Sequence, residues 1–183
     1  MVNEEKCTGS IACVLRKSIN VSLIKLYAKE YELICTTRNK TETHNSEMGI
    51  VNHFSSYLRN ELARNRIFEG YNVDCEYNRN MEYVKDLPSF PQGTRPDLII
   101  HDRGFNKANL LVVEFKGWWN MTHKEVESDK QKIREFMDKR GKYKYGFGLF
   151  IMLGREKAIV EELRMIKDRF QWIAWDSDRG NED

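Results

Sequence analysis

Short apolar runs alternate along this chain with stretches in which apolar side chains recur at helical spacing. Residues 98–100 and 110–113 are two such runs, rich in Leu, Ile and Val and separated by a polar stretch that contains Gly104. They predict two adjacent strands joined by a turn, for which a hairpin is the simplest topology. Residues 71–77 predict a strand before this hairpin, and residues 145–153 predict a strand after it.

Two helices are predicted around these strands. Val51, Phe54 and Leu58 form the apolar stripe of a helix that begins at Ser46. A second helix, from Val126, has the apolar residues Val126, Ile133, Phe136 and Met137 on one face. The predicted order over residues 46–153 is therefore helix, three strands, helix and strand.

Other elements are predicted outside this core. An N-terminal helix, expected to pack on the core or on another subunit in a homodimer, is indicated by Ile24, Tyr27, Tyr31 and Ile34. The polar residues 36–45 are interpreted as a linker without a function of its own. A helix near the other end is indicated by Ile159, Leu163, Ile166 and Phe170. Residues 171–175 would follow it as an edge strand.

Length and composition fit one domain with an extension. A chain of 183 residues, 40% of them hydrophobic, can bury a single core. We divide it into an N-terminal helix and linker, residues 1–45, and a main domain, residues 46–183. The chain has no membrane-spanning apolar run and no charged-then-apolar leader, which predicts a soluble cytoplasmic protein. The four cysteines and four histidines lack metal-ligand spacing, so we expect reduced cysteines and no zinc site.

Charged residues stand at the ends of the two central strands. Asp97 precedes the first, and Glu114 and Lys116 end the second. A hairpin centred between Phe105 and Asn106 would place Asp97 opposite Glu114, with their β-carbons about 5 Å apart. Lys116 would share their face of the sheet. Neighbouring carboxylates repel each other, and a hard cation such as Mg²⁺ relieves this, whereas the alternative is a surface hairpin with a cross-strand ion pair.

The segments Pro96-Asp97 and Glu114-Phe115-Lys116 resemble the signature of the PD-(D/E)xK nuclease superfamily. The resemblance implies a restriction-endonuclease-like αβββαβ core over residues 46–153, with a mixed central sheet flanked by helices. It also implies a Mg²⁺-dependent deoxyribonuclease, an endonuclease or an exonuclease, with Mn²⁺ as a substitute, that leaves a 5′-phosphate. Asp97, Glu114 and the backbone carbonyl of Phe115 would bind the metal. Lys116 would orient the attacking water and stabilise the phosphorane.

The chain also resembles a prokaryotic branch of that superfamily at outer positions: Ser46-Glu47, residues 73–79, and Asp129 followed by Lys132. Glu47 lies four residues before Val51 on the inward face, so it either complements the helix dipole or reaches the metal site, and the resemblance favours the site. For Asp129 we favour a local pair with Lys132 over a direct catalytic role.

Charge gives a weaker indication of nucleic-acid binding. The whole chain has a net charge of +2, but between residues 129 and 145 seven bases minus three acids give +4. The candidate contacts to a DNA or, less favoured, RNA backbone are Lys130, Lys132, Arg134, Lys139 and Arg140. A solvated helix face is the alternative. Tyr143, Tyr145, Trp118 and Trp119 could stack on bases, although core positions are the more common role of such aromatics.

These patterns favour a metal-dependent nuclease. A non-cleaving nucleic-acid-binding or assembly module with the same fold is the first alternative, and a dimerisation domain with structural ion pairs is the second. Metal binding and turnover separate the three, because only the nuclease has both.

Overall fold

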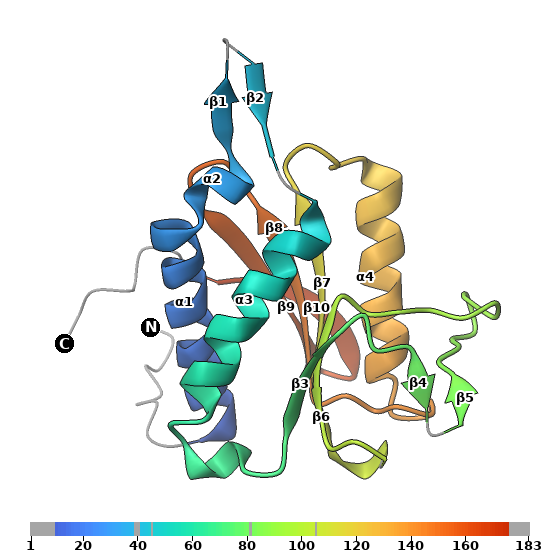
Figure 1. The fold of residues 1–183 in the computed structure, drawn as a ribbon. Helices are drawn as coiled ribbons and strands as arrows, with labels where there is room; N and C mark the ends of the chain where they lie inside the picture. Colours follow the sequence, from blue (N-terminus) through green and yellow to red (C-terminus); the bar gives the residue numbers. More distant parts are fainter. Residues whose placement is uncertain (1–9, 39–40, 45, 81, 105, 176–183) are drawn as a thin grey trace.

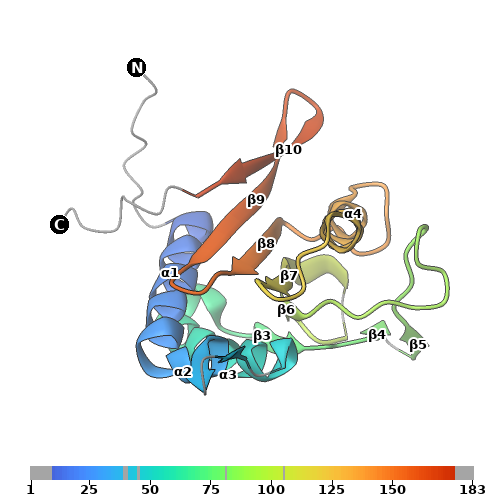
Figure 2. The ribbon, with the colours of Figure 1, turned by 90° about the horizontal axis from the view of Figure 1, so that it is seen from above.

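The computed structural model describes residues 10–38, 41–44, 46–80, 82–104 and 106–175 (Figure 1). It is a mixed α/β fold around a six-stranded sheet with strand order β10-β9-β8-β7-β6-β3. Helices α1 and α3 cover one face of this sheet, and α4 covers the other (Figure 2). The sheet strands are β3 (Asn72–Cys75), β6 (Leu98–His101), β7 (Asn109–Gly117), β8 (Phe147–Leu153), β9 (Ala158–Ile166) and β10 (Arg169–Ala174).

Strands β7 and β8 are parallel, and every other neighbouring pair in the sheet is antiparallel. Two small hairpins lie outside it: β1 (Thr36–Arg38) with β2 (Thr41–Thr43), and β4 (Arg79–Asn80) with β5 (Tyr83–Val84). Short 3-10 turns occur at η1 (Arg66–Phe68) and η2 (Asn106–Ala108). Within the described residues, no helix is long and apolar enough to cross a membrane.

The predicted central hairpin is confirmed, including its register. Leu98 pairs with Val113 in the β6–β7 ladder. One further step along this register places Asp97 opposite Glu114, as the sequence predicted. At the other end the register shifts between Ile100 and His101, so the irregularity lies away from the acidic residues.

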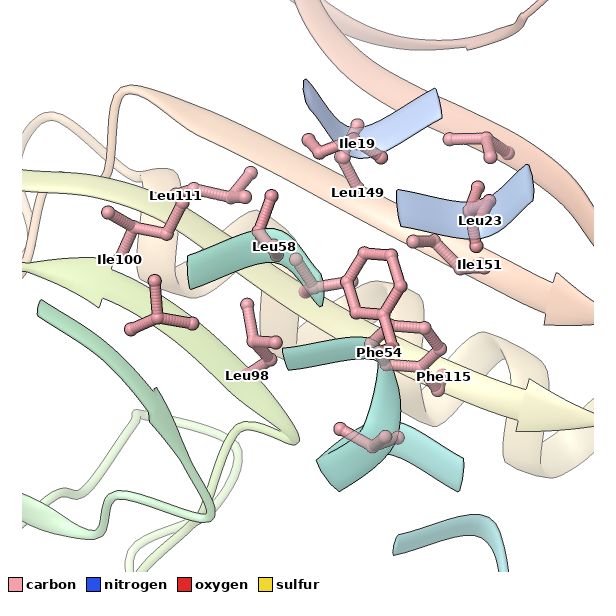
Figure 3. Close-up of a cluster of buried hydrophobic side chains, with 14 of the residues drawn as sticks. Ile19, Leu23, Phe54, Leu58, Leu98, Ile100, Leu111, Phe115, Leu149 and Ile151 are labelled. Atoms are coloured by element: carbon pink, nitrogen blue, oxygen red, sulfur yellow. The ribbon is translucent and has the colours of Figure 1, made fainter. Parts of the chain in front are cut away.

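Helix α3 (Glu47–Leu62) begins directly after its N-cap, Ser46, whose side chain accepts a hydrogen bond from the Gly49 nitrogen. The predicted stripe is buried against the sheet, and Figure 3 shows Phe54 and Leu58 within this cluster. The rings of Phe54 and Phe115 meet edge to face with centroids 5.3 Å apart. This packing fixes the phase of β7, because Phe115 points toward α3 and the residues on either side of it point away.

Helix α4 (His123–Met137) starts three residues before the predicted Val126, after the N-cap Thr122. Its buried residues are Asp129, Ile133, Phe136 and Met137. The helix lies very close to β8: a β-carbon at Gly148 would be 2.4 Å from Ile133 Cγ2 and 2.3 Å from Met137 Sδ. Gly148 therefore sets how deeply α4 packs on the sheet.

The N-terminal helix is present, but its predicted inward face is wrong. Helix α1 (Ile11–Lys29) and the short α2 (Tyr31–Ile34) replace a single helix, and Ile24 is 66% exposed. The face of α1 that joins the core contains Leu15, Ser18, Ile19, Ser22, Leu23 and Leu26. Two serines on this buried face hide the true apolar stripe from a periodicity search. One of them, Ser22, donates its hydroxyl to the Ser18 carbonyl within the helix.

The predicted helix from Ile159 to Phe170 is also wrong, because this segment forms the hairpin β9–β10. Lys167 and Asp168 connect the strands with φ values of 48° and 60°, which suit a tight two-residue turn. Strand alternation is obscured by Glu162, a charged residue at a buried position. The edge strand predicted after it is confirmed as part of β10.

Two smaller expectations need correction. The segment predicted as a linker contains the hairpin β1–β2, which projects from the end of the molecule where α3 begins (Figure 1). Cys13 is disulfide-bonded, contrary to the expectation of reduced cysteines. Cys35 and Cys75 are free thiols, as expected.

Candidate active site

The acidic and basic residues singled out in the sequence come together where β7 ends beside the first turn of α3 and the middle of α4. Strand β6 begins at Leu98, beside Val113 of β7, whereas β7 continues past that point to Gly117. The last residues of β7 therefore have no strand partner on the β6 side. Their backbone groups, which no strand pairs on this side, determine where the site's carboxylates are held.

Two carboxylates cap this open edge of β7. Asp97 Oδ2 accepts a hydrogen bond of 2.7 Å from the Phe115 nitrogen, and Glu47 Oε2 accepts one of 2.7 Å from the Gly117 nitrogen. Backbone groups of residues two apart face the same edge of a strand, as do the N–H and C=O of one residue. The carbonyl of Phe115 therefore points to the same edge as these two carboxylates.

Glu114 is the most enclosed charged group of the site. It is 1% exposed, and its Oε1 atom has no hydrogen-bond partner among the described residues. Its Oε2 atom accepts a hydrogen bond of 3.2 Å from Lys132 Nζ. A buried oxygen without a partner is costly unless a ligand completes it.

An alternating chain of charges runs from Glu114 to Glu47. Lys132 Nζ lies 2.8 Å from Asp129 Oδ1, and Lys116 Nζ lies 2.9 Å from Asp129 Oδ2. Lys116 Nζ also lies 3.9 Å from Glu47 Oε1. The local Asp129–Lys132 pair is thus confirmed, and it connects both lysines of the site. Asp129 holds Lys116 and Lys132 with its two oxygens.

The electrostatics of the site favour an added cation. Burial raises the pKa of Asp97 to about 6, and the Glu47 carboxylate adds to this rise. Burial and then the charge of Asp97 raise the pKa of Glu114 well above its usual range. Burial also raises the pKa of Glu47. The carboxylates therefore resist ionisation, and a divalent cation beside them would favour their charged forms.

The pKa of each lysine is also raised, which for a lysine favours the charged form. Burial by itself would lower the pKa of Lys116, but its hydrogen bond and charge interaction with Asp129 outweigh this effect and raise it. Burial of Lys132 is likewise outweighed, chiefly by the charge of Glu114 and by the hydrogen bond to Asp129. Both ammonium groups are charged at neutral pH, and neither is a metal ligand.

The donor set suits a hard cation. Within the part of the chain that the structure describes, no group of three or more His, Cys, Asp or Glu side chains forms a closed metal cage. Mg²⁺ does not need one, because it is often held by one or two carboxylates together with waters and substrate oxygens. Asp97 and Glu114 provide two such carboxylates, and the unpartnered Glu114 Oε1 provides a free oxygen.

The basic run on α4 does not form one surface. Lys130 pairs with Glu161 at 2.6 Å, and Arg134 lies over the Trp172 ring, so both face the β9–β10 hairpin. Lys132 faces Glu114, as described above. Lys139 and Arg140 are exposed but follow the far end of α4, where the Arg140 guanidinium lies 3.6 Å from Asp138. These residues therefore do not form one continuous surface, and their contact with nucleic acid stays a prediction.

The aromatic residues near this run have structural roles. Tyr143 and Tyr145 are 1% and 3% exposed and contact the Phe136 ring, so neither can stack on a base. Trp118 donates its indole N–H to the Ile34 carbonyl. Trp119 stacks on His44 with centroids 3.8 Å apart. The two tryptophans thus join the loop after β7 to the segments on either side of the β1–β2 hairpin.

Sequence reasoning missed the wall of the site formed by the loop before Asp97. The Phe90 ring lies 6.0 Å from Lys132 Nζ. This loop is attached to α4, because the Ser89 nitrogen donates a hydrogen bond of 3.1 Å to Glu135. The two prolines Pro88 and Pro91 indicate a turn in the sequence, but nothing in their spacing indicates which helix the turn contacts.

Comparison of the chain with protein-family models finds no match, and comparison with curated proteins finds none either.

Proposed function

We propose that this protein is a divalent-metal-dependent nuclease that hydrolyses phosphodiester bonds, in DNA rather than RNA. The observation that carries the proposal is the buried Glu114 carboxylate, with an oxygen free of hydrogen bonds and Lys116 two residues further on the same face of β7. A buried acid, a facing acid and a neighbouring lysine are the groups that metal-assisted phosphoryl transfer requires.

The restriction-endonuclease-like fold is part of this proposal. Its support is the element order α3, β3, β6, β7, α4 and β8, which agrees with the αβββαβ order that the PD-(D/E)xK signature implies. A second support is the register of the central hairpin: Leu98 pairs with Val113, and one further step would set Asp97 opposite Glu114.

Asp97, Glu114 and the Phe115 carbonyl would hold the metal. Mg²⁺ or Mn²⁺ would lower the pKa of the attacking water and neutralise charge on the phosphate. Lys116 holds an ammonium group beside these acids, anchored by Asp129 at 2.9 Å. Such a fixed cation can orient a water and stabilise the charge that develops on the phosphate oxygens.

Asp129 and Glu47 act through other groups. Asp129 positions both Lys116 and Lys132. Glu47 binds the end of β7 through the Gly117 nitrogen and faces Lys116 with its other oxygen, so its charge would restrain the lysine and the metal's water ligands. Lys132 neutralises Glu114 from the side opposite the free oxygen.

The test is cleavage of supercoiled, linear and single-stranded DNA and of single-stranded RNA in Mg²⁺ or Mn²⁺, with EDTA as control. We expect metal-dependent cleavage of at least one DNA substrate by the wild-type chain and none by Glu114→Gln. Nicked or linear products from supercoiled DNA would identify an endonuclease. Cleavage that persists in EDTA, or in Glu114→Gln, would contradict the proposal.

The ion-pair chain supports a second function, a non-cleaving assembly or nucleic-acid-binding module. Five of the charged groups already neutralise one another in alternation, so the site can persist without a metal. Calorimetric titration with Mn²⁺ separates the two functions when combined with the cleavage assay. Metal binding without turnover on any substrate would favour the module.

A further inference from the structure

A cavity lies at the end of the molecule opposite the candidate active site. It has a volume of about 630 Å³ and is enclosed by the last turn of α3, η1, the start of β3 and Arg103. Glu47 and Arg59 lie twelve residues apart on α3, which corresponds to about 18 Å along the helix axis. The cavity is therefore separate from the carboxylates of the active site.

Three arginines from three different elements line this cavity. Arg59 belongs to α3, Arg66 to η1, and Arg103 follows β6. The acidic residue among the lining side chains is Glu69, and Asp74 behind the wall pairs with Arg103. Three guanidinium groups against these two carboxylates leave a charge of +1, which favours an anion, and guanidinium groups are suited to the oxygens of a phosphate.

Two of these arginines are held in place before any ligand arrives. Arg59 donates from Nε and Nη2 to the Val73 carbonyl, at 3.0 and 2.8 Å. Arg103 donates from Nε to Asp74 Oδ2 at 2.8 Å and from Nη2 to Asp74 Oδ1. A guanidinium has five N–H donors, so each arginine keeps donors for a ligand. Because these side chains are already ordered, binding costs them less conformational entropy.

The rest of the lining suits a ligand larger than phosphate alone. Tyr71 contributes aromatic surface, and Asn65 and Asn72 contribute amides, whereas Phe68 belongs to the buried core behind the lining. A volume of about 630 Å³ is in the usual range for cavities that bind small molecules. Arginines for a phosphate, an aromatic ring for a planar group and amides for its polar edge together match the parts of a nucleotide.

We propose that this cavity binds a phosphate ester of mononucleotide size, with Arg66 as the mobile arginine that closes on the phosphate. Arg66 is the residue for this role because Arg59 and Arg103 are fixed by Val73 and Asp74. The proposal does not depend on nuclease activity, since none of the residues concerned belongs to the active site.

The test is a calorimetric titration of the full chain with adenosine 5′-monophosphate. EDTA and the Glu114→Gln background exclude binding through an active-site metal. Parallel titrations use adenosine, inorganic phosphate and a five-nucleotide single-stranded DNA. We expect the monophosphate to bind at least tenfold more tightly than adenosine, because a charge-assisted hydrogen bond is among the stronger polar contacts.

Arg66→Ala should weaken monophosphate binding by about tenfold or more. Arg64→Ala is the matched control. Arg64 lies two residues from Arg66, outside the cavity lining, and pairs with Glu61 at 3.2 Å. The Arg64→Ala variant should therefore bind the monophosphate as tightly as the parent chain. Equal affinity for the monophosphate and adenosine, or an unchanged affinity in Arg66→Ala, would overturn the proposal. Binding of the oligonucleotide without binding of the monophosphate would also overturn it, by assigning the arginines to a nucleic-acid surface.

Discussion

Asp97 is fixed beside Glu114 by a backbone contact, the 2.7 Å hydrogen bond from the Phe115 nitrogen to Asp97 Oδ2. The bond occurs just beyond the last pair of the β6–β7 ladder, where a side chain replaces the next strand residue. It explains how the two acids remain neighbours although burial raises the pKa of both, and although the charge of Asp97 raises the pKa of Glu114 further.

The first prediction follows from this contact. Asp97→Asn keeps an oxygen for the Phe115 nitrogen but removes the charge, so the fold should be retained and Mn²⁺ binding lost. The pKa of Asp97 is raised to about 6, above its ordinary value of 3.8, so its burial costs stability that is lost as the pH rises from about 3.8 to about 6 and stays lost above that. Asp97→Asn should therefore raise the melting temperature more at pH 8 than at pH 4.

Asp102→Asn provides the control, because Asp102 follows the other end of β6 and lies outside the site. Mn²⁺ titrations and thermal melts at both pH values would be measured for both variants. Unchanged Mn²⁺ affinity in Asp97→Asn would remove this residue from the metal site.

The second prediction concerns Lys116. Lys116→Met retains much of the aliphatic side chain and removes the ammonium group, so Mn²⁺ should still bind while cleavage slows by about a hundredfold or more. Lys124→Met, an exposed lysine in the first turn of α4, should cut at the wild-type rate. Single-turnover cleavage under saturating metal is the measurement, and a wild-type rate in Lys116→Met would leave its ion pairs with a structural role only.

Glu47 and Ser46 allow catalysis and helix capping to be separated. The Ser46 side chain accepts the hydrogen bond from the Gly49 nitrogen, whereas Glu47 accepts from Gly117 in β7. Ser46→Ala should lower stability by about 1 kcal/mol and leave cleavage unchanged. Glu47→Gln should depress cleavage far more than stability. Melting temperature and Mn²⁺-dependent cleavage would be measured on the same samples. Full cleavage activity in Glu47→Gln would contradict a role of Glu47 in the site.

The close approach of α4 to β8 gives a fourth prediction. Gly148→Ala places a β-carbon against Ile133 and Met137, which should push α4 outward, cost about 1–3 kcal/mol and move Lys132 away from Glu114. In Gly146→Ala the new β-carbon would be 3.4 Å from the Leu110 carbonyl, so it serves as the milder control. Chemical unfolding and cleavage assays on both variants would be decisive, and equal losses would show that depth of packing does not control the site.

The sequence predicted the central hairpin because its signals are local. Two apolar runs are symmetrical about one polar turn, and the acids are at matching distances from it, so Asp97 and Glu114 could be paired from counting alone. The inward faces of α1 and β9 could not be predicted in this way. Ser18 and Ser22 interrupt the apolar stripe of α1, and Glu162 occupies a buried position on β9.

The site itself was predicted only in part. The relation of Glu114 to Lys116 follows from strand alternation, which the sequence shows directly. The contact of Lys132 with Glu114 joins two elements, and it depends on how α4 docks on the sheet over Gly148. That depth is decided by packing between distant residues, so no local pattern reports it. The contact of the Phe90 loop with α4 also joins residues distant in the sequence, so it could not be predicted from a local pattern either.

The last prediction concerns the buried ion-pair cluster that connects α1 to β9. Glu162 accepts hydrogen bonds from Arg16 at 2.8 and 3.0 Å, from Arg164 at 2.9 Å and from the Trp175 indole at 2.9 Å. Burial by itself would raise the pKa of Glu162, but these donors outweigh it and lower the pKa to about 2. The stability that these contacts contribute is present above pH 4.5, the ordinary pKa of a glutamate, and is lost as the pH falls from 4.5 through about 2.

Glu162→Gln should therefore destabilise the chain by about 2 kcal/mol at pH 7, somewhat less than the full shift implies, because Arg16 and Arg164 are partly exposed to solvent. Glu161→Gln, on the neighbouring residue of β9, removes a smaller ion pair with Lys130 and should cost less. Urea unfolding at pH 7, 5 and 3 would measure both. The deficit of Glu162→Gln should be nearly the same at pH 7 and pH 5 and smaller at pH 3, since the stability linked to the wild-type carboxylate is lost below about pH 4.5. A deficit that stays constant over this range would mean that Glu162 stabilises the protein by shape and hydrogen bonding, without a contribution from its charge.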